Sequence, residues 1–305
     1  MSLKRYDSQD LILASIGFAI VIFGIAGNLL VVIAVWKKRF LRSTTNYLLV
    51  NLAVSDILNL VFLPFMLLQS YAIFEGGPFA DFLCKFIMSF NVPLTASCVS
   101  ILTLIVLSVE RYHAIVKPMK AGMRLREETV KYAIITVWLS GIALSLPFYI
   151  FGHYDTTKHR CKLVEAVYKY TSSIYFISIG LLILIFVPFL IISFCYFQIV
   201  RELYFKSKVE PQNVAAQEDA RTKRKLVKVS LTVTLAYVIC FFPTAITLCL
   251  GAYDRAKYGS RGFQMASLMY FLESALNPLF YACQSTNFRQ AFKEVMKCRC
   301  VQTGT

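Results

Sequence analysis

The chain has 305 residues, of which 57% are hydrophobic and only 16% are charged. A soluble globular domain is nearer half apolar and a quarter charged, so this balance excludes an ordinary soluble domain. The formal net charge of +15 raises the question of a nucleic-acid partner, but the distribution of the basic residues argues against one.

Seven long apolar runs follow one another along the chain, each near the length of about 20 residues that a helix needs to cross a bilayer. They are Leu11–Trp36, Tyr47–Ile73, Phe86–Val109, Val130–Phe151, Ile174–Phe197, Val227–Leu250 and Phe263–Cys283. With their polar ends, the predicted spans are 11–36, 47–73, 82–112, 130–151, 174–204, 222–250 and 263–283. The sequence therefore predicts an all-α membrane protein, a seven-transmembrane helix bundle over 1–305 with a short amphipathic eighth helix at 287–298.

Lysine and arginine divide unequally between the two sides of the predicted bundle, with 22 of the 32 on one side. By the positive-inside rule this side is cytoplasmic, which places the amino terminus outside the plasma membrane. The first run is too long for the core of a signal peptide, so we expect it to be retained. The basic side favours anionic membrane lipids and an acidic protein partner over nucleic acid. Lys206–Glu218 is the one clear polar linker.

Four of the nine cysteines lie at the end of a predicted span or outside the spans. Cys84 begins the third span on the outer side, and Cys161 lies in the longest outer loop. Because the outside is oxidising, we expect a disulfide between them. Cys298 and Cys300 lie among basic residues after the last span, where the setting favours S-palmitoylation. Two free cytosolic thiols are the alternative for this second pair.

Two carboxylates, Asp56 and Glu273, lie well inside predicted spans, and no lysine or arginine lies in a span interior to pair with them. Charged groups at this depth are costly and usually functional. Glu273, Asn277 and Tyr281 are four residues apart and share one face of the last helix. Oxygen-rich surroundings of this kind suit a hard cation such as Na⁺. The alternative is a polar contact between helices that shares a proton.

The third span ends on the inner side with Glu110-Arg111-Tyr112. An arginine beside a glutamate at this depth is costly unless something binds it, so we interpret the pair as a latch. Prolines inside the later spans, Pro188, Pro243 and Pro278, interrupt the helix hydrogen bonds and indicate segments that can pivot. Fixed bends are the alternative.

Short motifs in matching order make the chain similar to a known family. They are Gly27-Asn28, Asn51–Asp56, Glu110-Arg111-Tyr112 with Ala114-Ile115 and Pro118, Trp138, Pro188 with Tyr196, Cys240–Pro243, Asn277–Tyr281 and Asn287-Phe288-Arg289. Along nearly its full length the chain resembles rhodopsin-like (class A) G-protein-coupled receptors. Leu63-Pro64-Phe65 resembles the neuropeptide receptors among them.

The resemblance implies a receptor, not an enzyme, that needs no cofactor and couples an extracellular ligand to nucleotide exchange on a heterotrimeric G protein. It implies an activation switch of Glu110, Arg111, Tyr112, Tyr196, Asn277, Pro278 and Tyr281. It implies a transmission core of Ile101, Pro188, Tyr237, Phe241 and Pro243. An allosteric sodium ion would be held by Asp56, Ser100, Glu273, Ser274 and Asn277. The expected ligand pocket includes Gln69, Leu94, Ser97, Thr244, Leu248, Gln264 and Phe271. Arrestin is a further expected partner. Thr303 and Thr305 in the tail offer few phosphorylation sites for it to bind.

Several residues depart from the family pattern. Phe241 replaces the usual tryptophan of span six, and Tyr237 replaces the phenylalanine below it. Lys223 stands where some relatives carry an acid, so we expect no second ionic latch to Arg111. Cys84 lies 27 residues before Arg111, about two more than usual. We expect a bulge at Asn91-Val-Pro93 to absorb the difference, because Pro93 cannot keep its helix bond.

The outer parts of the predicted spans lack the residues that two other ligand classes require. Asn91–Leu94 has no aspartate of the kind that amine receptors use, and Phe263–Glu273 has no lysine for retinal. The resemblance of Leu63-Pro64-Phe65 to neuropeptide receptors implies a neuropeptide ligand, with a lipid or small molecule as the alternative.

Other classes of protein fit less well. A transporter or channel with the two buried carboxylates on its path would often show repeated halves, and the chain has none. The chain has only three histidines, and no nucleophile–base spacing of the kind that an enzyme needs stands out. A zinc site at His153 and His159 is a weaker interpretation than two surface histidines. A receptor that binds ligand without signalling is disfavoured by the intact inner motifs.

Overall fold

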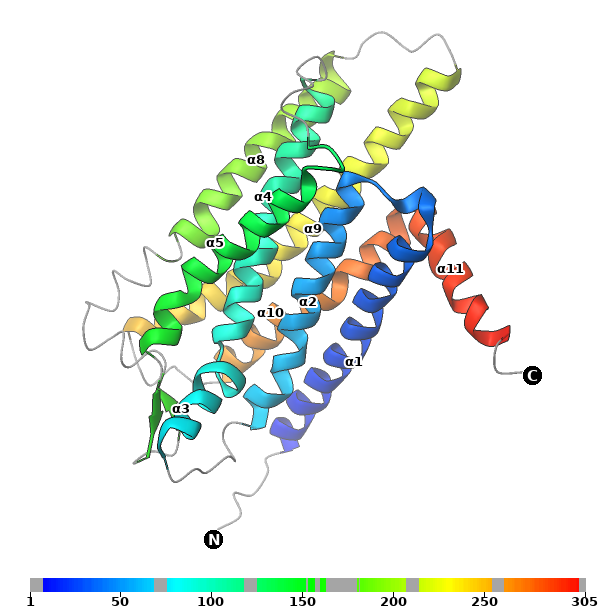
Figure 1. The fold of residues 1–305 in the computed structure, drawn as a ribbon. Coiled ribbons are helices and arrows are strands. Elements are labelled where there is room, and N and C mark those ends of the chain that lie inside the picture. Colours follow the sequence, from blue (N-terminus) through cyan, green and yellow to red (C-terminus); the bar gives the residue numbers. More distant parts are fainter. Residues whose placement is uncertain are drawn as a thin grey trace.

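The structure is a computed structural model, and it describes one bundle of long helices packed side by side (Figure 1). The described residues are 8–68, 76–117, 125–151, 153–156, 160–162, 180, 182–206, 214–253 and 261–301. We call the end of the bundle that holds α3 (Pro78–Leu83) and the strands the outer end. The opposite end, from which α11 (Thr286–Val301) projects, is the inner end.

Seven long helices build the bundle, with shorter elements at its ends. The long helices are α1 (Ser8–Lys37), α2 (Thr44–Leu68), α4 (Asn91–Ile115), α5 (Val130–Phe151), α8 (Val187–Val200), α9 (Val214–Tyr253) and α10 (Arg261–Gln284). π-helical turns lie at Cys84–Met88, Leu182–Phe186 and Arg201–Lys206, and a 3₁₀ turn at Arg39–Leu41. The predicted seven-helix bundle with an eighth helix is confirmed.

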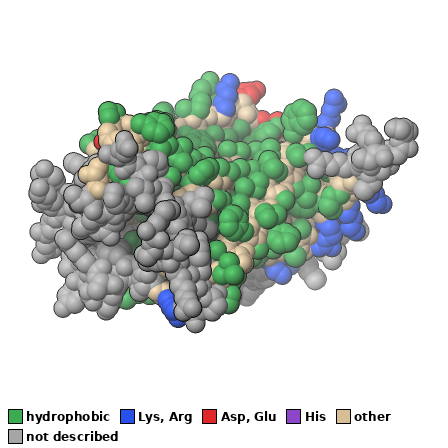
Figure 2. Space-filling model, turned by 90° about the horizontal axis from the view of Figure 1, so that it is seen from below, with side chains coloured by type: hydrophobic (Ala, Val, Ile, Leu, Met, Phe, Trp, Pro, Cys, Tyr) green, Lys and Arg blue, Asp and Glu red, His purple; other side chains and the backbone are tan. Residues whose placement is uncertain are grey.

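Six helical segments of the described chain are long and apolar enough to cross a membrane. α10 does not meet the same criterion, because Glu273, Ser274 and Asn277 lower its hydropathy. All three side chains are buried, and α10 packs against α9, α1 and α2, so it is the seventh member of the bundle. Large apolar side chains cover much of the bundle surface, and Figure 2 shows them as wide green areas between the basic groups. Such a surface suits lipid and not water.

Two element boundaries differ from the prediction. Residues 214–218 were expected in the polar linker, but α9 begins at Val214 and runs for 40 residues. The linker prediction was wrong there because Ala, Gln and Glu are good helix formers even without an apolar face. The expected bulge at Asn91-Val-Pro93 lies earlier: the chain forms the π-helical turn Cys84–Met88 and bends at Ser89. Pro93 instead occupies the first turn of α4, where its missing N–H costs nothing.

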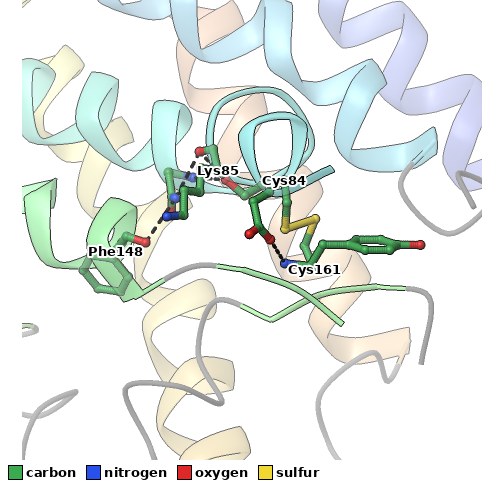
Figure 3. The surroundings of a disulfide bond; sticks show 8 residues. Cys84, Lys85, Phe148 and Cys161 are labelled. Atoms are coloured by element: carbon green, nitrogen blue, oxygen red, sulfur yellow. Dashed lines mark hydrogen bonds between the residues drawn. A yellow bond between two sulfur atoms is a disulfide. The ribbon is translucent and has the colours of Figure 1, made fainter. Parts of the chain in front are cut away.

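A short hairpin lies over the outer end, which an all-helical prediction did not contain. β1 (His153–Asp155) and β2 (Arg160–Lys162) pair antiparallel. Cys84 and Cys161 form the expected disulfide, with their Cα atoms 5.5 Å apart (Figure 3). The Tyr154 N–H also donates to Asp81 Oδ1 at 2.8 Å. Both links hold the hairpin against the start of the third span.

The inner end is fastened by contacts between distant segments. Lys38, after α1, forms an ion pair with Glu294 on α11. The Lys38 hydrogen bond, followed by that of Gln290, lowers the pKa of the exposed Glu294 carboxyl. The Arg289 guanidinium on α11 donates to the carbonyls of residues 282 and 283 in the last turn of α10. These bonds link the two helices at their junction. On α11, Phe288, Ala291, Phe292 and Val295 are buried, so its apolar face lies toward the bundle.

Close helix approach places the polar interior. A side chain at Gly24 would put its Cβ 2.5 Å from Leu60 Cδ1 and 3.0 Å from Ala275 Cβ. Glycine there lets α1 approach α2 and α10 closely, as small residues do in membrane bundles. This approach brings Asn28 within reach of α10, where its amide donates 2.8 Å to the Ser274 carbonyl.

Candidate functional site

The predicted latch lies at the inner end of α4. Arg111 Nε is 3.2 Å from Glu110 Oε2, and the two side chains are only 11% and 5% exposed. Because water is largely excluded, the attraction between the two charges is screened less than in an exposed pair. The structure therefore brings together the pair that the sequence singled out. Next to it, the centroid of the Tyr112 ring lies 6.2 Å from that of Phe194 on α8. The Lys117 ammonium lies over the same Tyr112 ring, 5.4 Å from its centroid.

The two tyrosines of the predicted switch lie in the buried core of the bundle. Tyr196 and Tyr281 are both buried, at 4% and 0% exposure. Both belong to the inner apolar cluster with Leu104, Leu107 and Ile199. The Tyr281 ring lies 5.5 Å from Phe288, so the end of α10 and the start of α11 are packed as one unit.

A second contact at the inner end joins α9 to α10. Gln284 Nε2 donates to Thr232 Oγ1 at 2.9 Å. The side chain of Lys223, for which no ionic latch was expected, lies outside the described part of α9. The bond between Gln284 and Thr232 is an uncharged amide–hydroxyl contact.

A polar cluster occupies the middle of the bundle around Asp56 and Glu273. The Asn277 amide donates to Asp56 Oδ2 at 2.8 Å and to Glu273 Oε1 at 3.2 Å. Asp56, Glu273 and Asn277 are 1%, 6% and 0% exposed. Asn59 donates to Ser274 Oγ at 3.1 Å, which extends the cluster along α2. One amide group thus holds two buried carboxyl groups on different helices.

Further oxygens in this cluster have no hydrogen-bond partner among the described residues. They are Asp56 Oδ1, Asn28 Oδ1, Asn59 Oδ1 and Asn277 Oδ1, and all four atoms are buried. Buried polar atoms normally find a partner, so such a group is typical of a site for water or an ion. Carboxylate and amide oxygens are the ligands that hard cations prefer. Ser100, also expected at this site, shares a 2.8 Å hydrogen bond with Ser55 instead of one with a carboxylate.

An additional polar layer lies one turn further inward. The Asn51 amide donates to Thr103 Oγ1 at 2.8 Å, and the Trp138 indole donates to Asn51 Oδ1 at 2.9 Å. These bonds join α2, α4 and α5 through side chains that the motif residues Asn51 and Trp138 supply. Thr103 was missed by the sequence analysis, and no local pattern distinguishes it from other hydroxyl residues in spans.

The residues of the predicted transmission core come from α4, α8 and α9. Tyr237 and Phe241 on α9 stack with ring centroids 5.4 Å apart and planes inclined by 14°. Ile101, Pro188 and Tyr237 are buried, and Pro243 lies inside α9 half-buried. Tyr237 and Ile101 belong to the same apolar cluster as Tyr196 and Tyr281.

The predicted ligand-pocket residues are placed less uniformly. Thr244 is buried and donates 2.9 Å to the Ala266 carbonyl, while Leu94 and Leu248 are half-buried. Gln264 is exposed at the outer end of α10. Phe271 is fully buried against Leu60 and Leu63, so it faces packed side chains.

Some predicted residues lie beyond what the structure describes. Gln69, Thr303, Thr305 and His159 lie outside the described residues, as do the side chains of His153, Cys298 and Cys300. Within the described part of the chain, no group of three or more His, Cys, Asp or Glu could hold a metal ion. The lipidation sites therefore stay predictions, and the disfavoured zinc site at His153 and His159 stays untested.

Tyr270 on α10 is the residue that sequence reasoning missed most clearly. It is 4% exposed, and its hydroxyl hydrogen-bonds Ser97 Oγ and donates 3.1 Å to the Pro93 carbonyl. Ser97, by contrast, was expected at the pocket. A weak signal existed, since Tyr270 lies three and four residues before Glu273 and Ser274 on the same helix face.

The comparison with known families defines the class of the protein. The model described as "7 transmembrane receptor (rhodopsin family)" matches residues 27–281, well over half of the chain. The chain therefore belongs to the rhodopsin family of seven-transmembrane receptors, which confirms the resemblance drawn from its motifs. It is a multi-pass membrane protein and a receptor, not an enzyme.

Individual relatives make the comparison more specific. Somatostatin receptor type 5 of Rattus norvegicus is 30% identical over 92% of this chain and 76% of its own length. The allatostatin-A receptor of Bombyx mori is 30% identical over 91% of this chain and 77% of its own length. The QRFP-like peptide receptor of Branchiostoma floridae is 28% identical over 92% and 77%.

Proposed function

We propose that the protein is a plasma-membrane receptor for an extracellular peptide that drives nucleotide exchange on a heterotrimeric G protein. The observation that carries this proposal is the shielded Glu110–Arg111 ion pair at the inner end of a rhodopsin-family bundle. The basic inner residues support an orientation with the amino terminus outside. The names of the relatives, receptors for somatostatin, allatostatin-A and QRFP-like peptides, support a peptide ligand.

Signalling would be a shift between two populations. A ligand at the outer end changes the inner end only if it binds the open arrangement more tightly than the closed one. Each tenfold bias needs about 1.4 kcal/mol of differential binding. In the closed arrangement Glu110 holds Arg111, and in the open one Arg111 is released to the G protein. Tyr196 and Tyr281, which belong to one buried apolar cluster, would repack when Arg111 is released.

The cluster around Asp56 is the proposed site for an allosteric sodium ion. The support comes from its donor set: carboxyl groups of Asp56 and Glu273 and unpaired buried amide oxygens of Asn28, Asn59 and Asn277. A bound cation supplies positive charge between helices α1, α2 and α10 and so favours the arrangement in which they stay together. Anionic inner-leaflet lipids, palmitoylation at Cys298 or Cys300, and arrestin complete the proposed partners and modifications.

The decisive experiment is a peptide-library screen of the whole chain with nucleotide exchange as the readout. We expect at least one peptide to stimulate exchange, and the Arg111→Ala variant to bind that peptide while exchange falls to background. Arg126→Ala, which removes an exposed arginine on the same inner side, is the matched control and should signal normally. Exchange retained by Arg111→Ala would defeat the latch, and stimulation only by lipids or small molecules would defeat the peptide assignment.

A further inference from the structure

Tyr270 forms a polar contact between two helices in the outer half of the bundle. Its hydroxyl donates to the Pro93 carbonyl at 3.1 Å and accepts from Ser97 Oγ, so both capacities of the phenol oxygen are used. Pro93 and Ser97 lie in the first two turns of α4, and Tyr270 comes from the middle of α10. These bonds are the described hydroxyl contacts between α10 and the outer part of α4.

The ring of Tyr270 reaches a third helix. Its centroid lies 5.7 Å from that of Phe241 on α9, and Phe241 in turn stacks on Tyr237. On its other sides the ring lies 5.1 Å from Phe90 and 4.9 Å, edge to face, from Phe271. Aromatic pairs at these distances are favourable beyond the area they bury. Tyr270 therefore positions Phe241 as well as bonding α4.

The location matters because of what lies above and below it. Phe241 has no indole N–H, so at this level α9 offers no polar group of that kind to its neighbours. Inward on α10, Ser274 follows Tyr270 by one turn and accepts from Asn59. Asn277, another turn inward, holds the carboxyl groups of Asp56 and Glu273. A shift of α10 away from α4 at Tyr270 would therefore be carried along the helix into the buried polar cluster.

We propose that Tyr270 is the positioning residue that keeps the receptor in its resting arrangement, through its hydroxyl on α4 and its ring on Phe241. An agonist entering from the outer end separates α10 from α4 by breaking this hydrogen-bond pair. This inference rests on the proposed receptor function, and it adds a residue that the family motifs do not contain.

The test compares basal nucleotide exchange of the purified whole chain in lipid nanodiscs, with a purified heterotrimeric G protein and no peptide. Tyr270→Phe removes only the hydroxyl, and Ser97→Ala removes its partner. Each variant should raise basal exchange roughly three- to tenfold, the factor that one hydrogen bond of ordinary net strength gives. Affinity for the nucleotide-free heterotrimer should also rise, because the variants raise the population of the open arrangement that binds it. The double variant should not exceed Tyr270→Phe, because that single variant already removes the bond to Ser97.

Tyr149→Phe is the matched control. Its hydroxyl bonds Thr95 Oγ1 at 3.0 Å and so joins α4 to α5 on the other side of α4. This variant should lower the unfolding temperature but leave basal exchange and heterotrimer affinity within twofold of the original chain. A merely structural role for Tyr270 would give it the same outcome as Tyr149.

The outcomes separate this inference from the receptor assignment. A chain that responds to a peptide while Tyr270→Phe and Ser97→Ala keep basal exchange unchanged would overturn the role of Tyr270 alone. If Tyr270→Phe fails to fold, Ser97→Ala decides by itself. No exchange from the original chain with any peptide or heterotrimer would instead defeat the receptor function.

Discussion

The inner latch and the central polar cluster are built in opposite ways. Glu110 and Arg111 are neighbours in sequence on one helix, and their ion pair needs little else to form. Asp56 and Asn277 lie 221 residues apart and meet only because α2 and α10 pack together. The first can switch by a local side-chain movement, whereas the second changes only when whole helices move. Inner release and central rearrangement are therefore separable by mutation.

Removing the shared amide should have the largest effect on stability. Asn277→Ala leaves the carboxyl groups of Asp56 and Glu273 without their donor, which we expect to cost about 2–4 kcal/mol. Thermal unfolding in detergent measures the loss. Asn287→Ala removes the same group from the exposed start of α11 and should change little. Equal unfolding temperatures for both variants would show that the cluster is not held by Asn277.

The latch should affect signalling more than stability. Glu110→Gln keeps the shape of the side chain but removes the charge that holds Arg111. We expect basal exchange to rise about tenfold, equivalent to about 1.4 kcal/mol. Glu127→Gln, at an exposed acid before α5, is the control. If both variants behave alike, the local pair does not restrain the inner end.

Sodium sensitivity tests the central cluster alone. Basal exchange of the original chain should be lower in NaCl than in KCl by about fivefold, at the low end of coupling between sites. Asp56→Asn should make the two salts equivalent, because it removes the central carboxylate. Asp81→Asn, which alters only an outer carboxylate bonded to Tyr154, should keep the difference. A sodium effect that survives Asp56→Asn contradicts the proposed site.

The smallest effect is expected at the ion pair between Lys38 and Glu294. The pKa of Glu294 is lowered in the folded chain. The ion pair therefore stabilises the fold at pH values above the ordinary glutamate pKa of about 4.3. It is lost as the pH falls through the lowered pKa. Lys38→Ala should therefore lower the unfolding temperature slightly at neutral pH, and the difference should vanish in acid or high salt. Lys37→Ala, one exposed residue earlier, is the control.

Much of the fold could be predicted because the spans are marked by length and apolar content. The pairing of Glu110 with Arg111 could be predicted because the two residues are neighbours in the sequence. The spacing between Cys84 and Arg111 indicated two extra residues, but the predicted position of the irregularity that absorbs them was wrong. Proline is tolerated in the first helical turn, so Pro93 did not force the bend that the π-helical turn before it supplies.

The central site was only partly predictable. Asp56 and Glu273 stand out as carboxylates in apolar runs, but nothing local says that one amide joins them. The contact between Tyr270 and Ser97 spans 173 residues, and two hydroxyls in separate spans have many possible partners. The start of α9 was mistaken for a linker, although its composition contained the helix signal. Long-range partners need the packed structure.

The length of α9 gives a small outer movement a large inner reach. From Pro243 to its start at Val214, the helix is a rod of about 44 Å, at 1.5 Å per residue. A tilt of about 10° at the proline would carry the far tip roughly 8 Å sideways, while residues near the pivot scarcely shift. A pivot at Pro243 would make this stretch of α9 the long arm of a lever that ends beyond the inner end of the bundle.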